Sequence, residues 1–229
     1  MRKLLFALLA VIVLLVTADR IATAVAERKI SDRLASAYGL PAKPGVGVAG
    51  FPFLTQVLSG RYHTVSIDVP SVMAGGVRVT GLDARFTGVR ASLAQVLGRS
   101  PEPVTAQAAT ATGTVSLAAL RTGLPHGVTL RQHGRSLDVA GTTHYLGRAV
   151  SYSATVQPSA SAAGITLTPR QVRIGRPAHA PARALAGRLR LTVPLGALPL
   201  HLRISAVRVG RAGLDISATG RDVHFATGG

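Results

Sequence analysis

Histidine and acidic side chains are the residues of this chain that could bind a metal ion or exchange protons. The seven histidines are scattered without an H-E-x-x-H pair, and the chain has no cysteine. There is also no G-x-S-x-G elbow and no glycine-rich phosphate loop. Asp68, Asp83, Asp138 and Asp215 fall at polar positions of alternating segments, as on a solvated strand face. The sequence therefore predicts no metal, no cofactor and no catalytic residue, although two carboxyl groups could still meet in the fold.

Basic side chains are the second group that could carry a function. Lysine and arginine number 26 against nine acids, which gives a net charge of +17. Such an excess attracts phosphate groups, but it is also typical of a GC-rich coding sequence. Nucleic acid is not the expected partner, because aromatic residues make up only 4% of the chain, no known binding motif occurs, and the N-terminus predicts export.

An apolar stretch, GFPFLTQVLSGRY, occupies residues 50–62. Pro52 can begin a short helix and Gly60 can end it. All the large apolar side chains are expected on one side of this helix; they are Phe51, Phe53, Leu54, Val57 and Leu58. Two interpretations stay open: a plug that closes one end of a core, or a lid that contacts a bilayer, with Arg61 and Tyr62 at the interface.

The N-terminus predicts export. Two basic residues precede an apolar run from Leu4 to Val16, which is shorter than the roughly 18 residues of a comfortable membrane span. Small residues in A-x-A spacing occur at 22–24 and 24–26, so both a cleaved signal peptide and a retained anchor are compatible with the sequence. Residues 1–24 are expected to precede a single domain, residues 25–229, on the outer side of the cytoplasmic membrane in the periplasmic cell envelope.

The elements that must position these residues can be read from periodicity. Apolar residues from Ile21 to Tyr38 recur at helical spacing, which predicts an amphipathic helix packed on the domain and ended by Gly39. Residues 65–69 then alternate with period two, and a phase slip at Gly81 predicts a β-bulge. The alternation continues to Phe225, which predicts a long antiparallel sheet with one apolar face and one arginine-bearing face.

Short helices and loops are expected to interrupt the sheet. Residues 92–97 and 116–120 each begin with a serine that can cap a helix. Residues 158–163 and 176–181 are poor in apolar periodicity and are predicted to be loops.

Two segments resemble a known family. GFPFLTQVLSGRYHTVSIDVP at residues 50–70 and GGVRVTGLDARFTGVR at residues 75–90 are similar to the LmeA family of actinobacterial envelope proteins, which bind phospholipid. The resemblance implies an exported, membrane-associated, β-rich α+β fold, in which a highly curved antiparallel sheet wraps around a long N-terminal helix as in tubular lipid-binding proteins. It also implies a link to mannan or lipoglycan elongation, and it brings no catalytic residues.

These observations predict a non-enzymatic protein that carries or senses phospholipid or lipid-linked glycan at a membrane surface. The expected lipid-binding residues are the apolar side chains of the short helix, the pair that follows it, and the apolar face of the next strand: Phe51, Phe53, Leu54, Val57, Leu58, Arg61, Tyr62, Val65, Ile67 and Val69. Two alternatives stay open. An enzyme of envelope glycan or lipid metabolism would need carboxyl groups that converge in a polar cleft, and a module that binds acidic wall polymer would have a filled core.

Overall fold

The computed structural model describes most of the chain, namely residues 2–37, 39–74, 76–96, 100, 102–122, 124, 127–145, 148–161, 164–175, 191–194, 200 and 202–225. The chain divides into two compact units with interleaved segments. Unit 1 comprises residues 1–70, 83–110 and 220–229, and unit 2 comprises residues 71–82 and 111–219. The single domain expected over residues 25–229 stays a prediction.

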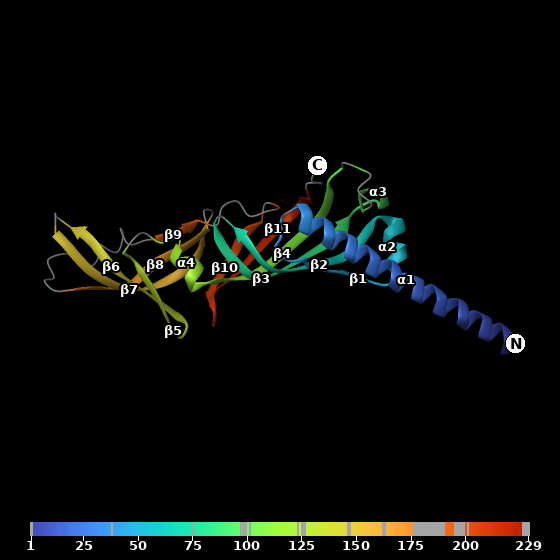
Figure 1. Cartoon of the computed structure of the whole chain (residues 1–229), viewed down its shortest axis with the longest axis horizontal. Coiled ribbons are helices and arrows are strands. Elements are labelled where there is room, and N and C mark those ends of the chain that lie inside the picture. The colour runs from blue at the N-terminus through green and yellow to red at the C-terminus, as the bar shows by residue number, and fades with distance from the viewer. Residues whose placement is uncertain are drawn as a thin grey trace. The chain divides into compact units, whose positions relative to one another are not determined.

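The described residues form helices and two β-sheets (Figure 1). The helices are α1 (Arg2–Ala37), α2 (Phe53–Ser59), α3 (Leu93–Val96) and α4 (Leu117–Thr122). The strands are β1 (Gly45–Ala49), β2 (Arg61–Ala74), β3 (Val77–Arg90), β4 (Val104–Ser116), β5 (Thr129–His133), β6 (Ser136–Tyr145), β7 (Arg148–Ser161), β8 (Gly164–Ile174), β9 (Leu191–Pro194), β10 (Arg203–Val209) and β11 (Gly213–Phe225).

The strands lie in two sheets of different composition. One sheet has the order β1-β2-β3-β4-β11-β10, and the other has the order β5-β6-β7-β8-β9. Neighbouring strands such as β1 and β2, or β7 and β8, pair antiparallel. The predicted α+β class, with antiparallel strands and a long N-terminal helix, is confirmed, and the strands divide over two sheets.

Helix α1 is a single unbroken helix that joins the apolar run to the predicted amphipathic segment. It ends at Ala37, beside Gly39 with a φ of 56°, as the glycine predicts. The apolar face predicted for its second half is wrong at Ile21 and Val25, which are exposed, but Ile30 and Leu34 of the same face are partly buried. The fully buried residue of α1 is Asp19. Polar contacts, described below, attach this helix to the rest of unit 1. By length and composition α1 could cross a membrane, a test that a signal sequence also passes.

Strand β3 confirms the phase slip at Gly81. Val77 and Val79 are buried before the glycine, and Ala84 and Phe86 are buried after it, so the buried face moves from odd to even positions. Gly81 has a φ of 58°, a left-handed conformation that other residues rarely adopt. Gly88 is also left-handed, with a φ of 62°, and after it the buried face moves back to odd positions at Val89.

The predicted interruptions are partly correct. Ser92 and Ser116 cap α3 and α4, because their hydroxyl oxygens accept hydrogen bonds from the backbone N–H groups of Gln95 and Ala119. The loop predicted at residues 158–163 is wrong up to Ser161, since Pro158 lies in β7 opposite Leu167 of β8. The pairing of β7 with β6 ends at Val156, so this proline lies where no β6 residue needs its missing N–H. The loop predicted at residues 176–181 lies outside the described residues.

Unit 2 has a dense apolar core. Its fully buried side chains come from β4, α4, β5, β6, β8, β9 and β11; the largest are Leu120, Leu130, Leu137, Ile165, Leu167 and Leu214. Unit 1 buries smaller residues and aromatic rings, including Phe86, whose ring packs edge-to-face on the partly buried Phe225 with 4.9 Å between the centroids.

Candidate functional site

Helix α2 forms where the two helix-boundary residues predicted it. Pro52 is extended at the N-cap, and Gly60 adopts a left-handed conformation at the C-cap. The Gly60 N–H donates to the carbonyl oxygen of Val57 at 3.2 Å, which closes the last turn. The short helix is therefore confirmed over Phe53–Ser59.

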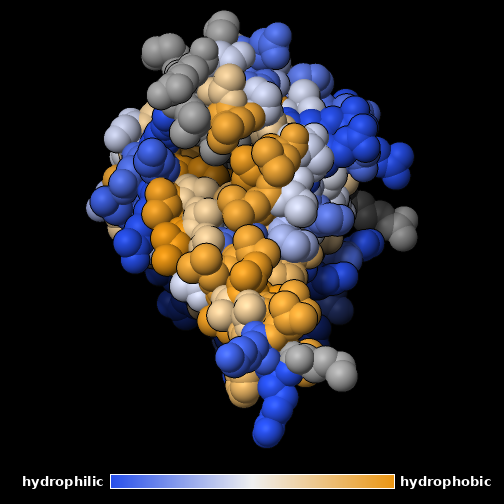
Figure 2. Space-filling model, turned by 90° about the vertical axis from the view of Figure 1, so that its right-hand side faces the viewer, coloured by the Kyte–Doolittle hydropathy of each residue, from blue (hydrophilic) through white to orange (hydrophobic). Residues whose placement is uncertain are grey.

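The side chains on and beside α2 differ widely in burial. Phe53 and Gln56 are buried, each 4% exposed, whereas Phe51, Leu54 and Leu58 are 57%, 39% and 86% exposed. The large apolar side chains expected on one side of the helix therefore differ in burial, because Phe53 is buried while Leu54 and Leu58 are exposed. We call Phe51, Leu54 and Leu58 the apolar stripe. Figure 2 shows hydrophobic side chains gathered in a band on the face turned to the viewer, with hydrophilic residues on both sides.

Gln56 is buried because it ties α2 to the start of β2. Its Oε1 accepts a hydrogen bond from the His63 backbone N–H at 3.1 Å and lies 3.3 Å from Nδ1 of the same histidine. One turn earlier, the Phe53 ring packs against the Tyr62 ring with 6.2 Å between centroids. Gly50 has a φ of 115°, and a Cβ there would lie 2.6 Å from Gln56 Nε2, so this glycine leaves room for the amide.

Helix α1 supports the other end of α2. Asp19, which is 2% exposed, accepts a hydrogen bond at Oδ1 from the Leu54 backbone N–H at 2.8 Å. The neighbouring Arg20 guanidinium lies 5.3 Å from the centroid of the Phe51 ring, within cation–π range. Farther along α1, Glu27 Oε1 accepts a hydrogen bond from the Val48 N–H at 2.9 Å. The packed face of α1 thus includes hydrogen-bonding residues as well as the partly buried Ile30 and Leu34.

A basic cleft of about 300 Å³ lies directly after α2. It is lined by consecutive residues of β2 and β3 and by one residue of β4: Arg61, Tyr62, His63, Gly88, Val89, Arg90 and Gln107. Arg61, His63 and Arg90 are exposed, while Tyr62 and Val89 are buried beneath them. Burial raises the pKa of the Tyr62 phenol, so this hydroxyl stays neutral at physiological pH. None of the lining residues is acidic, and the cleft can therefore attract an anion.

Gly88 shapes this cleft. A Cβ at this position would lie 2.5 Å from Gln107 Oε1 and 2.6 Å from its Cδ, and the φ of 62° is strained for other residues. The glycine therefore allows the Gln107 side chain to lie across β3. This role was not predicted, although Gly88 lies in the GGVRVTGLDARFTGVR segment.

The predicted site residues divide into three groups. Phe51, Leu54 and Leu58 form the exposed stripe, and Arg61 and Tyr62 line the cleft. Phe53 and Val69 are buried, and Val57, Val65 and Ile67 are partly buried; none of these five lines the cleft. Sequence reasoning missed Asp19, His63, Arg90 and Gln107. Asp19 had a signal, since it is the first acidic residue after a long apolar run.

Acidic side chains come together at one place in unit 1. Asp68 and Asp83 lie on β2 and β3, and the hydrogen bond between their carboxyl groups raises the pKa of Asp68; desolvation and the charge of Asp83 raise it further. Both residues are exposed, as expected of polar strand positions, and neither lines the cleft. The described part of the chain contains no group of three potential metal ligands; His126, His179 and His201 lie outside it.

Comparison with known proteins identifies a family for this chain. No curated protein and no solved structure is significantly similar to the chain. The model of a family described as LmeA-like phospholipid-binding matches residues 17–219, which include α2, the cleft and Asp19. Because this match covers most of its length, the chain belongs to the LmeA-like phospholipid-binding family.

Proposed function

We propose that this protein is a non-enzymatic phospholipid-binding protein of the cell envelope that holds a lipid headgroup phosphate in its basic cleft. The observation that carries the proposal is the position of the cleft. Arg61 directly follows α2, which bears the exposed apolar stripe, and Arg90 lines the same cleft within the same unit, so one lipid molecule could contact both the stripe and the cleft. A phospholipid has the same two parts, a charged phosphate and apolar chains.

The chemistry of the cleft suits a phosphate ester. An arginine guanidinium donates two parallel hydrogen bonds to phosphate oxygens, and His63 and Gln107 offer further donors. A volume of about 300 Å³ is at the lower end of the range for small-molecule sites, which suits a headgroup better than a whole lipid. We expect the acyl chains to stay on the apolar stripe or in the bilayer.

The location follows from the N-terminus. The apolar helix α1 begins after Met1 with Arg2 and Lys3, the composition of a signal or anchor. We propose that everything after it lies outside the cytoplasmic membrane, where the protein carries or senses phospholipid or lipid-linked glycan and supports mannan or lipoglycan elongation. The alternative of an enzyme is not supported by the cleft, because its lining holds no carboxyl group.

The test is lipid binding by the full chain with matched arginine variants. Native mass spectrometry of protein purified from membranes should show a co-purifying phospholipid. Arg61→Gln and Arg90→Gln should each weaken binding of a fluorescent anionic phospholipid about tenfold, which corresponds to the roughly 1.5 kcal/mol or more of a charged hydrogen bond. Arg85→Gln removes an exposed arginine of β3 that is not in the cleft and is the control. Equal effects of all three substitutions would show that only net charge matters.

A further inference from the structure

We propose that α1 is a retained membrane anchor and that Asp19 holds the apolar stripe of α2 in the outer leaflet of the same bilayer. The inference concerns how the domain meets the membrane. It rests on the export proposed for the chain, and its experiment reads export separately.

The first observation is that Asp19 makes a structural hydrogen bond within unit 1. Pro52, at the N-cap of α2, makes no side-chain capping hydrogen bond, and the free N–H groups of a first helical turn need an acceptor. Asp19 provides one to Leu54 from 35 positions earlier in the chain, and it is nearly completely buried while doing so. Arg20 contacts the ring of Phe51, the residue just before Pro52.

Cleavage at either small-residue site would remove both contacts. A cut after Ala24 or after Ala26 would delete Asp19 and Arg20 and leave the Leu54 N–H without its acceptor. The candidate sites also lie inside an unbroken helix, where Ala22, Thr23 and Ala24 are partly buried. The family match begins at residue 17, ahead of both sites. Residues 17–24 are therefore part of the folded domain and not only of a leader segment.

The second observation is the length of the exposed apolar surface on α1. From Leu4 to Val16 the helix rises only about 18 Å, too short for a hydrocarbon core of about 30 Å. Beyond the exposed Arg20, Ile21 and Val25 are 60% and 45% exposed and extend this surface. From Leu4 to Val25 the rise is about 32 Å, which matches the core. A bilayer spanned in this way covers the level of Asp19.

The position of α2 follows from that level. Because α2 is hydrogen-bonded to Asp19, the apolar stripe lies beside the part of α1 that the outer leaflet covers. Leu58 is the most exposed of the large hydrophobic residues in the described chain. Such exposure is unfavourable in water and favourable in the apolar part of a leaflet. The exposed Arg28 and Lys29 follow Val25 and suit the anionic headgroups at the surface.

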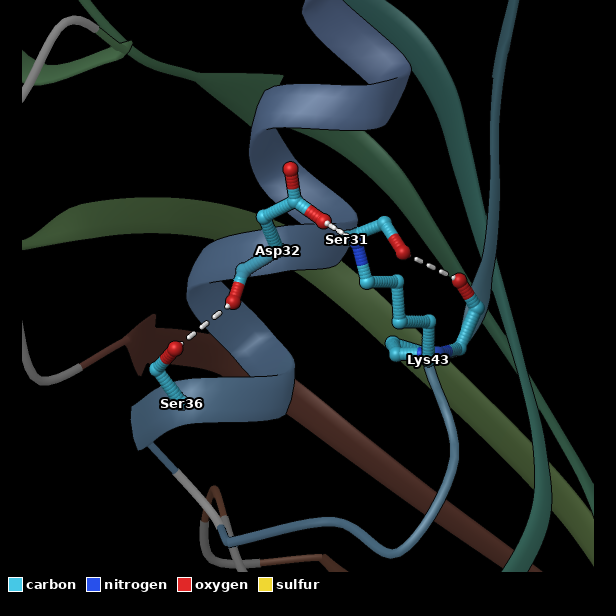
Figure 3. A network of polar contacts seen from close by, with 5 residues as sticks. Ser31, Asp32, Ser36 and Lys43 are labelled. Atoms are coloured by element: carbon cyan, nitrogen blue, oxygen red, sulfur yellow. Dashed lines mark hydrogen bonds and ion pairs between the residues drawn. The ribbon is translucent and has the colours of Figure 1, made fainter.

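The C-terminal end of α1 makes polar contacts, as expected for a part of the helix that lies in water. Figure 3 shows Ser31, Asp32 and Ser36 on this part of the helix, with Lys43 approaching from the following loop. Lys43 Nζ lies 2.6 Å from Asp32 Oδ1, and the Ser31 hydroxyl donates to the Pro44 carbonyl oxygen at 2.6 Å. Ser36 lies 17 residues beyond Asp19, about 26 Å along the helix axis.

The first experiment measures the N-terminus of the exported full chain. A reporter that is active only after export, fused to Gly229, establishes export, and intact mass then gives the length of the membrane-bound product. The expected product keeps residues 1–24. An exported product that begins at Val25 or Glu27 would overturn the inference. If that product still bound phospholipid, the proposed function would stand without it.

The second experiment measures the depth of α2. The chain has no cysteine, so Leu58→Cys and Leu54→Cys each provide a unique site for an environment-sensitive fluorophore in vesicles that contain phosphatidylglycerol. We expect spin-labelled lipid to quench both sites and aqueous iodide to quench the control Ser36→Cys. If iodide quenched Leu58→Cys and Ser36→Cys to the same extent, α2 would lie in water and the proposal would fail.

The role of Asp19 has its own readout. Asp19→Ala should speed hydrogen exchange in residues 53–57 at least tenfold and make the Leu58 probe more accessible to iodide. Asp19→Asn keeps a side-chain carbonyl acceptor and should restore slow exchange. Asp32→Ala breaks an exposed ion pair elsewhere on α1 and is the control. Unchanged exchange in Asp19→Ala would show that this residue does not hold α2.

Discussion

At the scale of single residues, two apolar side chains of one short helix have opposite environments. Phe53 is 4% exposed and its ring packs at a tilt against the Tyr62 ring, whereas Leu58 is 86% exposed. The sequence left a plug and a lid as alternative explanations of the same stretch. The structure assigns the buried side to Phe53 and Gln56 and leaves the apolar stripe exposed.

The two residues should therefore respond differently to truncation. Phe53→Ala should destabilise the protein by roughly 3 to 5 kcal/mol, because it opens a cavity beside Tyr62. Leu58→Ala should leave stability nearly unchanged and weaken phospholipid binding by as much as about 2 kcal/mol, since three carbons lose their apolar contact. The measurements are the denaturant midpoint and the binding of a fluorescent phospholipid to protein in nanodiscs.

The control for this pair is Met73→Ala, which truncates an exposed apolar side chain on β2 outside α2 and should change neither quantity. Large destabilisation by Leu58→Ala, with unchanged affinity per folded molecule, would return the apolar stripe to a purely structural role.

At the scale of elements, the neighbouring strands β2 and β3 bring together groups that are far apart in the sequence. They create the basic cleft at one place and the Asp68–Asp83 carboxyl pair at another. The pair behaves as like charges on adjacent strands do: one proton shared between the two carboxyl groups is favourable, and two negative charges are not.

Asp68→Asn tests this pair through the pH dependence of stability. The folded-state pKa of Asp68 is raised, so the contribution of the pair is fully present below the ordinary carboxyl pKa and is lost as pH rises through the raised value. We expect Asp68→Asn to be more stable than wild type at about pH 7 and less dependent on pH between about 4 and 7, by a small amount because the residue is exposed.

Chemical denaturation of both proteins across this pH range measures the difference. Asp83→Asn removes the same repulsion and should behave alike, and the double variant should gain little more. Lower stability of Asp68→Asn at neutral pH would mean that the ionised pair is favourable in the fold.

At the scale of the whole molecule, the proposal gives the net charge of +17 and the apolar stripe different effects on lipid binding. Attraction between arginine and phosphate is screened by salt, with a Debye length of about 10 Å at 0.1 M and about 3 Å at 1 M. Burial of acyl chain contributes about 0.8 kcal/mol per methylene and does not depend on screening.

Phospholipid binding should therefore weaken with salt and then level off. The measurement is a titration of fluorescent phosphatidylglycerol against protein in neutral nanodiscs from about 0.05 to 1 M salt. Arg90→Gln should reduce the salt-dependent part and Leu58→Ala the salt-resistant part. Complete loss of binding at high salt would favour the alternative in which the basic face binds acidic wall polymer.

The sequence by itself determined the features that depend on neighbours along the chain. Alternation predicted β2, β3 and most later strands, Gly81 predicted the phase slip, and Pro52 with Gly60 predicted α2, because strand period, glycine conformation and helix boundaries are local. Strands β4 and β7 were missed. The alanine and threonine residues of β4 produce weak alternation, and the end of β7 was mistaken for a loop.

Only the tertiary structure decided which side of each element is buried. On α2, hydrogen bonds to His63 place the polar Gln56 inside and leave Leu58 outside, against the hydropathy of the helix. On α1, Asp19 is buried because it accepts a hydrogen bond from the Leu54 N–H of α2, although Ile21 and Val25 are more apolar and stay exposed. The cleft likewise required β2, β3 and β4 to lie side by side. A hydrogen-bond partner 35 positions away has no signature in local periodicity, so the fold alone could choose it.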